Sequence, residues 1–283
     1  MVGYRNKYVI VLTACISPNG MIFTNLQDSK IREQQYREAI NFYLYNTKYK
    51  IVFCNNSGED ISLKFKDNSD RIEFLSFNGN NYNKNLGKGY GEFFILQYAF
   101  QNSEFIKRAS YVIKITGRLI IENISLIPKI NDIILGFPHN KIYLSIDTDS
   151  KFVDSRCIIA SKYFFDLFLV NNIVNDSQGY FFEHMLLDII NEYRNQFLIS
   201  DFCVNLRYCG VSGTSGNYYT LIYKSMYQNL IEVRNFCEFK KATYKESNMK
   251  LFCWISIISF VVRVHKAILK MINETFNHYN QLK

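Results

Sequence analysis

The sequence predicts an α/β fold with a mainly parallel central sheet, followed by a helical C-terminal extension. Continuous apolar runs at 8–16, 49–54 and 111–115 are typical of strands covered on both faces. Segments with helical periodicity separate these runs, as crossover connections between parallel strands require. Hydrophobic residues make up 48% of the 283 residues, which supplies a substantial core and excludes a mainly disordered chain.

The elements of the first half follow in a regular order. A strand at 8–16 ends in a Ser-Pro-Asn-Gly turn, and Asp28 or Ser29 can cap a helix over 31–45. Strands are expected at 49–54 and 72–77, then a polar, glycine-rich loop at 78–92 that opens a helix ending near 101, and a fourth strand at 111–115. Parallel sheets bind ligands at the carboxyl ends of their strands, so we expect the polar clusters after strands one, two and four to share one edge.

The second half is less regular. Strands are expected at 132–138, 141–146 and 156–159, and helices at 161–170 and 179–194. Residues 210–216 are rich in glycine and serine and predict a flexible loop between helical segments. This loop could order over a bound ligand as a lid, or it could be a plain connector.

Charge and cysteine content narrow the choice of partners. Lys+Arg 33 minus Asp+Glu 25 gives +8, which favours an anionic partner: a nucleic acid, a phosphate-bearing small molecule or a lipid surface. The basic residues are spread along the chain, which counts against nucleic acid. The seven cysteines are scattered without a C-x-x-C pair, which indicates reduced thiols in a cytoplasmic protein.

The C-terminal stretch 249–263 is apolar, contains Trp254 and has basic flanks. Its apolar core is too short to span a bilayer, which needs about 18 residues or more, but it suits a helix lying in a membrane interface. A packed C-terminal helix or a seam between two copies of the chain is the alternative. We therefore expect a domain at 1–220 and a helical extension at 221–283, peripheral on the inner face of the cell membrane.

Two segments are candidates for binding phosphate. Lys88-Gly89-Tyr90-Gly91-Glu92 opens a helix, where unpaired N–H groups and the helix dipole favour anions. Arg118 follows the fourth strand and could pair with a phosphate through two hydrogen bonds, and Gly117 would let the backbone approach it. An ordinary turn and a surface arginine are the alternatives.

Two pairs of residues carry carboxylates that could take part in chemistry. Asp147 and Asp149 form a D-x-D triplet that could hold Mg²⁺ or Mn²⁺ on a diphosphate, or could lie in a solvated loop. Glu183 stands beside His184 near the start of a helix and could act as a general base, although such a pair is often only surface.

Five short segments, in this order, carry a resemblance to a known family: 88–92 (KGYGE), 114–118 (KITGR), 154–157 (DSRC), 182–184 (FEH) and 210–216 (GVSGTSG). As an ordered set they resemble a family of bacterial capsule and O-antigen transferases that includes galactofuranosyltransferases. Those enzymes have the A-type, Rossmann-like glycosyltransferase fold. The resemblance covers roughly 8–220 and leaves the last sixty or so residues outside.

The resemblance implies an inverting glycosyltransferase. It would move a sugar from a nucleoside diphosphate donor, expected to be a UDP-sugar, to a hydroxyl of a lipid-linked surface polysaccharide such as capsule or lipopolysaccharide O-antigen. Glu183 would accept the proton of the acceptor hydroxyl, with Asp154 in reserve, while Arg156 and His184 would orient the acceptor or the base. The residues implied in donor binding are Thr13, Asn56 and Ser57 at the nucleoside, and Lys88, Gly89, Lys114, Thr116, Gly117 and Arg118 at the diphosphate.

One departure from the family concerns metal. A-type transferases usually place D-x-D at the end of the fourth strand, where this chain has Thr116-Gly117-Arg118. Basic side chains could then offset the diphosphate charge with no tightly bound cofactor, or Asp147 and Asp149 could supply a displaced Mg²⁺ or Mn²⁺ site. A non-catalytic binding or assembly protein at the membrane surface is the alternative function, and a homo-oligomer is left open.

Overall fold

The computed structural model describes residues 7–22, 24–147, 152–169, 174–213, 215–219, 228, 230–236, 257 and 261. The chain divides into two compact units. The larger unit comprises 1–125, 138–202 and 207–221 and contains the sheet; the smaller comprises 126–137, 203–206 and 222–283 and contains helix α4 (Ile127–Leu135).

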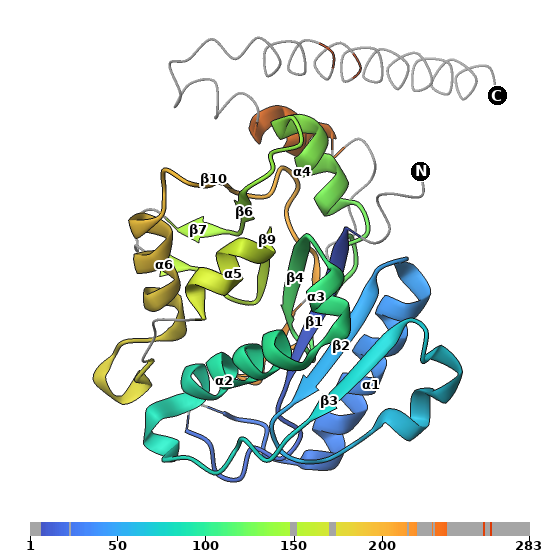
Figure 1. Cartoon of the computed structure of the whole chain (residues 1–283), viewed down its shortest axis with the longest axis vertical. Helices are drawn as coiled ribbons and strands as arrows, with labels where there is room; N and C mark the ends of the chain where they lie inside the picture. Colours follow the sequence, from blue (N-terminus) through green and yellow to red (C-terminus); the bar gives the residue numbers. More distant parts are fainter. Residues whose placement is uncertain are drawn as a thin grey trace, which may run out of the picture. The chain divides into compact units, whose positions relative to one another are not determined.

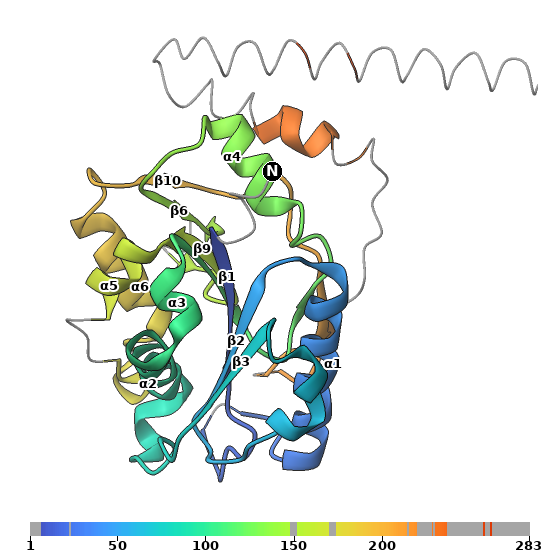
Figure 2. The ribbon, with the colours of Figure 1, turned by 45° about the vertical axis from the view of Figure 1, so that its right-hand side comes forward.

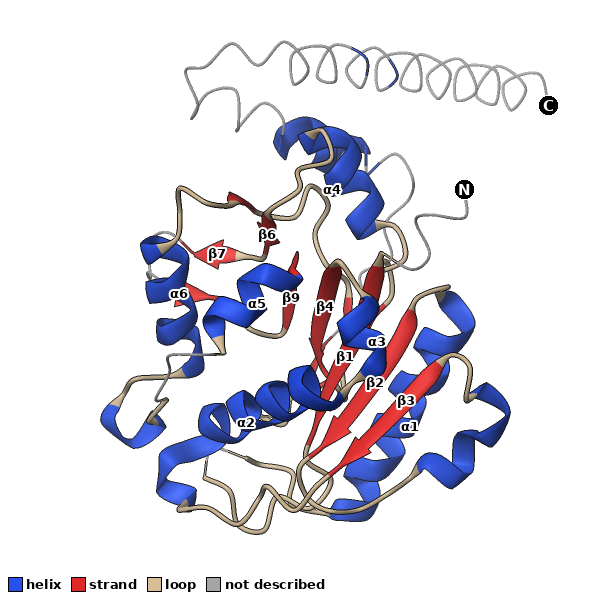
Figure 3. Ribbon diagram, in the orientation of Figure 1, coloured by secondary structure: helices blue, strands red, loops and turns tan. Residues whose placement is uncertain are grey.

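A seven-stranded sheet forms the centre of the larger unit (Figure 3). Its order is β10-β6-β9-β4-β1-β2-β3, and every neighbouring pair is parallel except those that involve β9, which runs antiparallel to β4 and β6. The expected α/β, Rossmann-like fold with a mainly parallel sheet is confirmed. The strands are β1 (Tyr8–Ala14), β2 (Lys50–Asn55), β3 (Ile72–Ser76), β4 (Tyr111–Thr116), β6 (Lys141–Tyr143), β9 (Cys157–Ser161) and β10 (Leu198–Ser200).

Helices cover both faces of this sheet, which explains the continuous apolar runs. Figure 2 shows α1 (Ser29–Asn46) on one side of β1–β3, with α2 (Gly87–Asn102) and α3 (Glu104–Arg108) on the other. Successive strand residues alternate between the faces. Val9 and Val11 of β1 belong to the same core cluster as Leu96 of α2, whereas Ile10 and Leu12 are buried on the opposite face.

Shorter elements complete the larger unit (Figure 1). Two small antiparallel sheets are present: one has the strand order β12-β11-β5, and the other pairs β7 with β8. The remaining bounds are η2 (Ser62–Asn68), η3 (Lys84–Leu86), β5 (Ile120–Ile121), β7 (Ile146–Asp147), β8 (Phe152–Val153), α5 (Lys162–Phe168), η4 (Asp176–Gln178), α6 (Phe182–Glu192), β11 (Tyr208–Val211) and β12 (Tyr218–Tyr219).

Three expectations need correction or lie outside the description. The strand expected at 132–138 is wrong: α4 occupies this segment, because Pro128 suits a first helical turn and Gly136 ends the helix in the left-handed region with φ 78°. The described residues 210–213 and 215–216 do not lie between helices, since they end β11 or connect it to β12. Of the stretch 249–263, only Ile257 and Val261 are described, and no helix of the described chain is long and apolar enough to cross a membrane.

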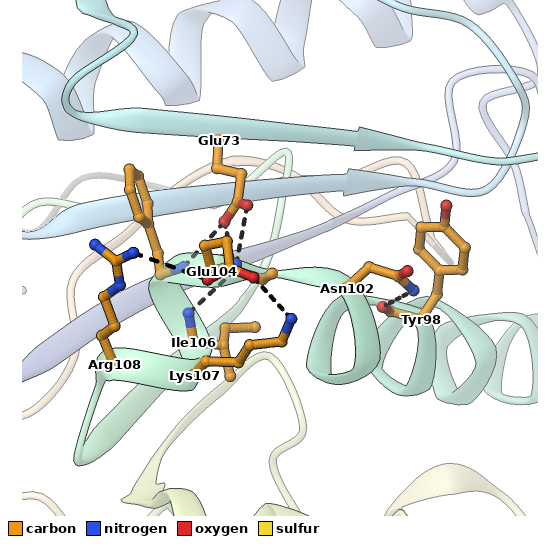
Figure 4. Close-up of polar contacts among 9 residues, drawn as sticks. Glu73, Tyr98, Asn102, Glu104, Ile106, Lys107 and Arg108 are labelled. Carbon is orange, nitrogen blue, oxygen red and sulfur yellow. Dashed lines mark hydrogen bonds and ion pairs between the residues drawn. The ribbon is translucent and has the colours of Figure 1, made fainter.

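A carboxylate on β3 fixes the junction between α2 and α3 (Figure 4). Glu73 accepts hydrogen bonds from the Ser103 hydroxyl, the Glu104 N–H at 3.0 Å and the Phe105 N–H at 3.2 Å. These are unpaired donors at the start of α3, so the contact caps the helix and ties it to the sheet. The position of α2 matters because its other end contributes to the cavity described below.

Replacing Glu73 with alanine should lower the free energy of unfolding by about 1–2 kcal/mol, because the start of α3 loses a charged acceptor. Urea unfolding followed by circular dichroism would measure it. Glu38→Ala, on the exposed side of α1, is the matched control and should change stability little. Equal effects of the two substitutions would contradict the capping role.

Candidate functional site

The larger unit contains a cavity of about 680 Å³ at the carboxyl ends of β1 and β4. Strand β9 is antiparallel to β4, so residues 154–156, which directly precede β9, reach the same edge. Helix α2, the start of α6 and the β11–β12 hairpin supply further wall. This edge is where parallel α/β sheets bind their ligands.

The cavity brings together most of the residues that the sequence singled out. Lys88, Arg118 and Glu183, which are 30 or more residues apart in the chain, all line it. The other expected site residues on its wall are Thr13, Asn56, Thr116, Asp154 and Arg156. Those that are not on the wall are Ser57, Gly89, Lys114, Gly117 and His184.

One face of α2 forms a wall of the cavity. Lys88, Gly91, Glu92 and Ile95 all line it, and their spacing of three and four residues places them on the same side of a helix. Lys88 is exposed in the first turn, and Glu92 follows one turn later. The helix therefore presents a cation and then a carboxylate to the same space.

The start of α2 is not the open anion site that the sequence predicted. The Gly89 N–H donates to the Asp176 carboxylate at 3.2 Å, and a Cβ at Gly89 would lie 2.8 Å from the other carboxylate oxygen. Asp176 therefore occupies the place of an anionic ligand at this helix end. In this structure the Gly89 N–H is therefore used by Asp176, and its expected contact with diphosphate stays a prediction, whereas Lys88 lines the cavity.

Asp176 itself is 5% exposed and its Oδ1 has no hydrogen-bond partner within the described residues. Burial raises the pKa of Asp176 above its ordinary value of 3.8, the Gly89 hydrogen bond opposes this rise, and the nearby Glu183 carboxylate adds to it. The sequence analysis did not single out this residue, which lies in the short η4 turn before the 182–184 segment and outside each of the five motifs.

Lys114 has a different role from the one expected. It is fully buried, its ammonium pairs with Glu92 Oε1 at 2.6 Å, and it also donates to the Ser155 carbonyl. Strand alternation places Lys114 on the same face as Val112, beneath α2, and away from the cavity wall. In this structure Lys114 is therefore used by Glu92 and the Ser155 carbonyl, and the expected contact with diphosphate stays a prediction.

The Lys114 pair is the middle of a longer polar chain. The Thr13 hydroxyl donates to Glu92 Oε1 at 2.8 Å, and the Ser155 hydroxyl donates to Glu183 Oε1 at 2.6 Å. Through the Ser155 backbone, Lys114 thus links the carboxylate on α2 with the carboxylate on α6. Two carboxylates of the cavity are held in place by one buried cation.

Asp154 and Arg156 bind each other. Arg156 donates to both carboxylate oxygens at 2.6–3.0 Å, and its guanidinium lies 4.3 Å from the Tyr208 ring centroid and 5.1 Å from that of Tyr219. Burial lowers the pKa of Arg156, but the hydrogen bonds and charge of Asp154 outweigh it and the net shift is upward. Both oxygens of Asp154 are therefore engaged by Arg156, whereas Glu183 accepts one hydrogen bond, from Ser155 to its Oε1.

Two arginines supply positive charge near the ends of β1 and β4. Arg118 is 7% exposed, donates to Gln35 Oε1 at 2.7 Å, and would lie 2.8 Å from a Cβ at Gly213 of the hairpin loop. Burial lowers the pKa of Arg118. The guanidinium nevertheless stays charged, because the ordinary pKa of arginine is very high. Arg32 of α1, which the sequence did not single out, also lines the cavity and donates to the Cys15 carbonyl at 2.8 Å.

The remaining expected residues act within the fold. The Ser57 hydroxyl accepts from the N–H groups of Ile16 and Ser17, a Cβ at Gly117 would lie 2.6 Å from the Thr13 carbonyl oxygen, and His184 Nδ1 accepts from the Phe181 N–H at the start of α6. Ser57 thus holds a turn, Gly117 permits a close strand contact and His184 holds a helix end, while the ligand and catalytic roles expected for these three residues stay predictions.

The expected metal pair is not assembled in the described chain. Asp147 ends β7, where its backbone pairs with Phe152, and Asp149 lies outside the described residues. No group of three histidine, cysteine, aspartate or glutamate side chains suited to a metal occurs among the residues the structure describes. The metal site expected at Asp147 and Asp149 therefore stays a prediction, and Lys88 and Arg118 are basic residues that line the cavity.

The larger unit is thus an α/β, Rossmann-like domain with a charged cavity at its carboxyl edge. No protein-family model matches the chain, and no curated protein matches it. The resemblance to capsule and O-antigen transferases therefore stays an expectation.

Solved structures with some similarity include three enzymes. They are a cytidylyltransferase from Leptospira borgpetersenii (10% identity, 93% of this chain and 96% of that one, TM-score 0.36), a 4-diphosphocytidyl-2C-methyl-D-erythritol synthase from Anaerococcus prevotii (10%, 81% and 96%, 0.34) and a protein described as a nucleotide-diphospho-sugar transferase from Desulfovibrio desulfuricans (13%, 91% and 97%, 0.34). Similarity at this level carries no conclusion about function, so the site has to be interpreted from its own residues.

Asp176→Asn should stabilise the protein near neutral pH, because it keeps an acceptor for the Gly89 N–H and removes a buried charge. Since the folded-state pKa of Asp176 is raised, the stability contributed by its protonated form is fully present below pH 3.8 and is lost as pH rises through the folded pKa. The gain from the substitution should therefore grow over that range. Urea unfolding from about pH 4 to pH 7 would measure it.

The matched control is Asp166→Asn on α5, where the carboxylate pairs with Lys162 at the surface. A stability difference between wild type and Asp176→Asn that is the same at every pH would contradict the burial of an ionising Asp176.

Proposed function

We propose that the protein is a glycosyltransferase that moves a sugar from a nucleoside diphosphate sugar to a hydroxyl of a glycan acceptor. The observation that carries the proposal is that Lys88, Arg118 and Glu183 line one cavity at the carboxyl edge of the sheet. Two cations, which can hold a diphosphate, and one carboxylate, which can take a proton, then face the same ligand.

Lys88 and Arg118 would bind the diphosphate. A guanidinium can form two parallel hydrogen bonds with phosphate oxygens, and an ammonium adds a compact positive charge. Negative charge builds up on the phosphate oxygen as the bond to the sugar breaks, so these cations would stabilise the transition state more than the ground state. Thr116 lines the same cavity and would also contact the diphosphate, while Thr13 and Asn56 would contact the nucleoside.

Glu183 would act as the general base. In a direct displacement, the acceptor hydroxyl oxygen bonds to the anomeric carbon while the bond from that carbon to the phosphate oxygen breaks. The nucleoside diphosphate leaves with the electron pair, and Glu183 takes the hydroxyl proton. Such a step inverts the anomeric centre, and the hydrogen bond from Ser155 to Oε1 would aim the carboxylate while leaving its other oxygen for the proton.

Aromatic side chains on the cavity wall would receive the acceptor. Phe152, Phe181 and Tyr219 all line the cavity, and ring faces offer apolar area to the C–H side of a sugar. The proposal includes three further parts that rest on the sequence. The acceptor is a lipid-linked surface polysaccharide, the donor is a UDP-sugar, and the protein lies peripherally at the inner membrane face. The segment 249–263 that would contact the membrane lies largely outside the described residues.

Isothermal titration with nucleoside diphosphate sugars carrying each common base tests the class of protein, and repeating it with EDTA tests the need for a cation. We expect one donor to bind, and Arg118→Ala to weaken its binding roughly 10- to 100-fold because a charged hydrogen-bond donor to phosphate is lost. Turnover should fall with it.

Arg108→Ala is the matched control, since Arg108 lies on α3 outside the cavity lining. A wild-type protein that binds none of the donors would exclude the proposed enzyme and favour a non-catalytic binding or assembly protein.

Glu183→Gln should reduce sugar transfer about 10²- to 10⁴-fold while donor affinity stays within a few-fold, because the amide cannot accept the proton. Release of the nucleoside diphosphate would report transfer, and titration would report donor affinity. Glu192→Gln at the end of the same helix is the control. Transfer at the wild-type rate in Glu183→Gln would remove Glu183 from the mechanism.

A further inference from the structure

Glu92 is a cavity carboxylate that the proposed mechanism leaves unused. It lies one helical turn after Lys88 on the α2 wall, and its side chain is 19% exposed. The four residues from Lys88 to Glu92 correspond to a rise of about 6 Å along the helix axis. A ligand whose phosphate contacts Lys88 would therefore extend past Glu92 with its neighbouring groups.

The Glu92 carboxylate is held through one of its oxygens. Oε1 accepts from the Thr13 hydroxyl at 2.8 Å and from the Lys114 ammonium at 2.6 Å. Oε2 has no hydrogen-bond partner within the part of the chain that the structure describes. The carboxylate is thus fixed in direction while half of its acceptor capacity remains for a ligand.

The ion pair between Lys114 and Glu92 contributes little net stability, because both charges lose most of their contact with water. Lys114 is fully buried beneath α2, and removing such a pair of charges from water usually offsets what their attraction gains. An apolar pair of similar volume would fill the same space at no loss of stability. The pair does achieve something that an apolar pair cannot, because it keeps an ionised acceptor at a fixed point on the cavity wall.

The chemistry of that acceptor limits what it can bind. An ionised carboxylate accepts hydrogen bonds and donates none, and it repels phosphate. The ligand group at this point must therefore be a donor, and a sugar ring offers hydroxyls next to its phosphate. We propose that Glu92 binds a hydroxyl of the nucleotide-sugar donor, and so makes the cavity selective for hydroxylated rings. This rests on the proposed function, and the hydroxyl can come from the ribose or from the transferred sugar.

The test compares how wild type and Glu92→Gln discriminate between ligands by isothermal titration. The probes are UDP, 2′-deoxy-UDP and UDP-glucose, with GDP, 2′-deoxy-GDP and GDP-mannose as the guanine series. If the ribose is bound, wild type should prefer UDP to 2′-deoxy-UDP roughly tenfold or more, and the preference should shrink to about twofold in the variant. If the transferred sugar is bound, Glu92→Gln should bind UDP as tightly as wild type does, and its affinity for UDP-glucose should be roughly tenfold lower than that of wild type.

Glu92→Gln leaves Lys114 buried beside a neutral partner and could therefore lower the stability of the protein. A second variant separates this effect from a loss of ligand discrimination. Glu92→Gln combined with Lys114→Met removes both charges and should show the same loss of discrimination. Thermal melts report folding for each variant, and Glu38→Gln on the exposed side of α1 is the matched control.

The outcomes separate this inference from the proposed function. Wild-type protein that binds nucleotides, with both discrimination ratios unchanged in the folded variants, overturns the role of Glu92 and leaves the proposed function standing. Wild-type protein that binds no nucleoside diphosphate or nucleoside diphosphate sugar of any common base overturns both.

Discussion

The cavity depends on one buried cation. Lys114 comes from the middle strand of the sheet, has no exposed surface, and contacts Glu92 of α2 and the Ser155 carbonyl at the start of β9. A charge in this position must be paired, because an isolated ammonium in the interior would cost several kcal/mol. The requirement fixes the distance between α2 and β9, and with it the places of Glu92 and Glu183 on the cavity wall.

The carboxylates of the cavity differ in how many of their oxygens already accept hydrogen bonds or ion pairs within the protein. Asp154 is saturated by Arg156 and Asp176 caps α2, so these two carboxylates hold the architecture. Glu183 and Glu92 are each held through one oxygen. This difference gives the proposed base and the proposed hydroxyl acceptor their separate roles, which residue types alone would not distinguish.

The strands of the central sheet could be predicted because both of their faces are buried, and burial on two faces leaves a continuous apolar run. The helix at 29–46 carried a cap and a periodicity that placed it within a few residues, whereas the helix at 87–102 begins inside the segment 78–92 that was expected to be a loop. The 127–135 helix was missed because its short apolar segment reads equally as a strand. Its Pro128 and Gly136 decide the matter only when they are read as helix start and stop.

By itself the sequence determined the fold class and the edge of the sheet where polar side chains gather, since both follow from local hydrophobic patterning and from the geometry of parallel strands. Which side chains face a ligand was decided by tertiary structure. Lys114 and Arg118 stand four residues apart after similar apolar neighbours, yet one is enclosed beneath α2 and the other lines the cavity. That difference arises from helices and carboxylates contributed by distant segments, Asp176 and Glu92 among them, and no local pattern encodes where those will pack.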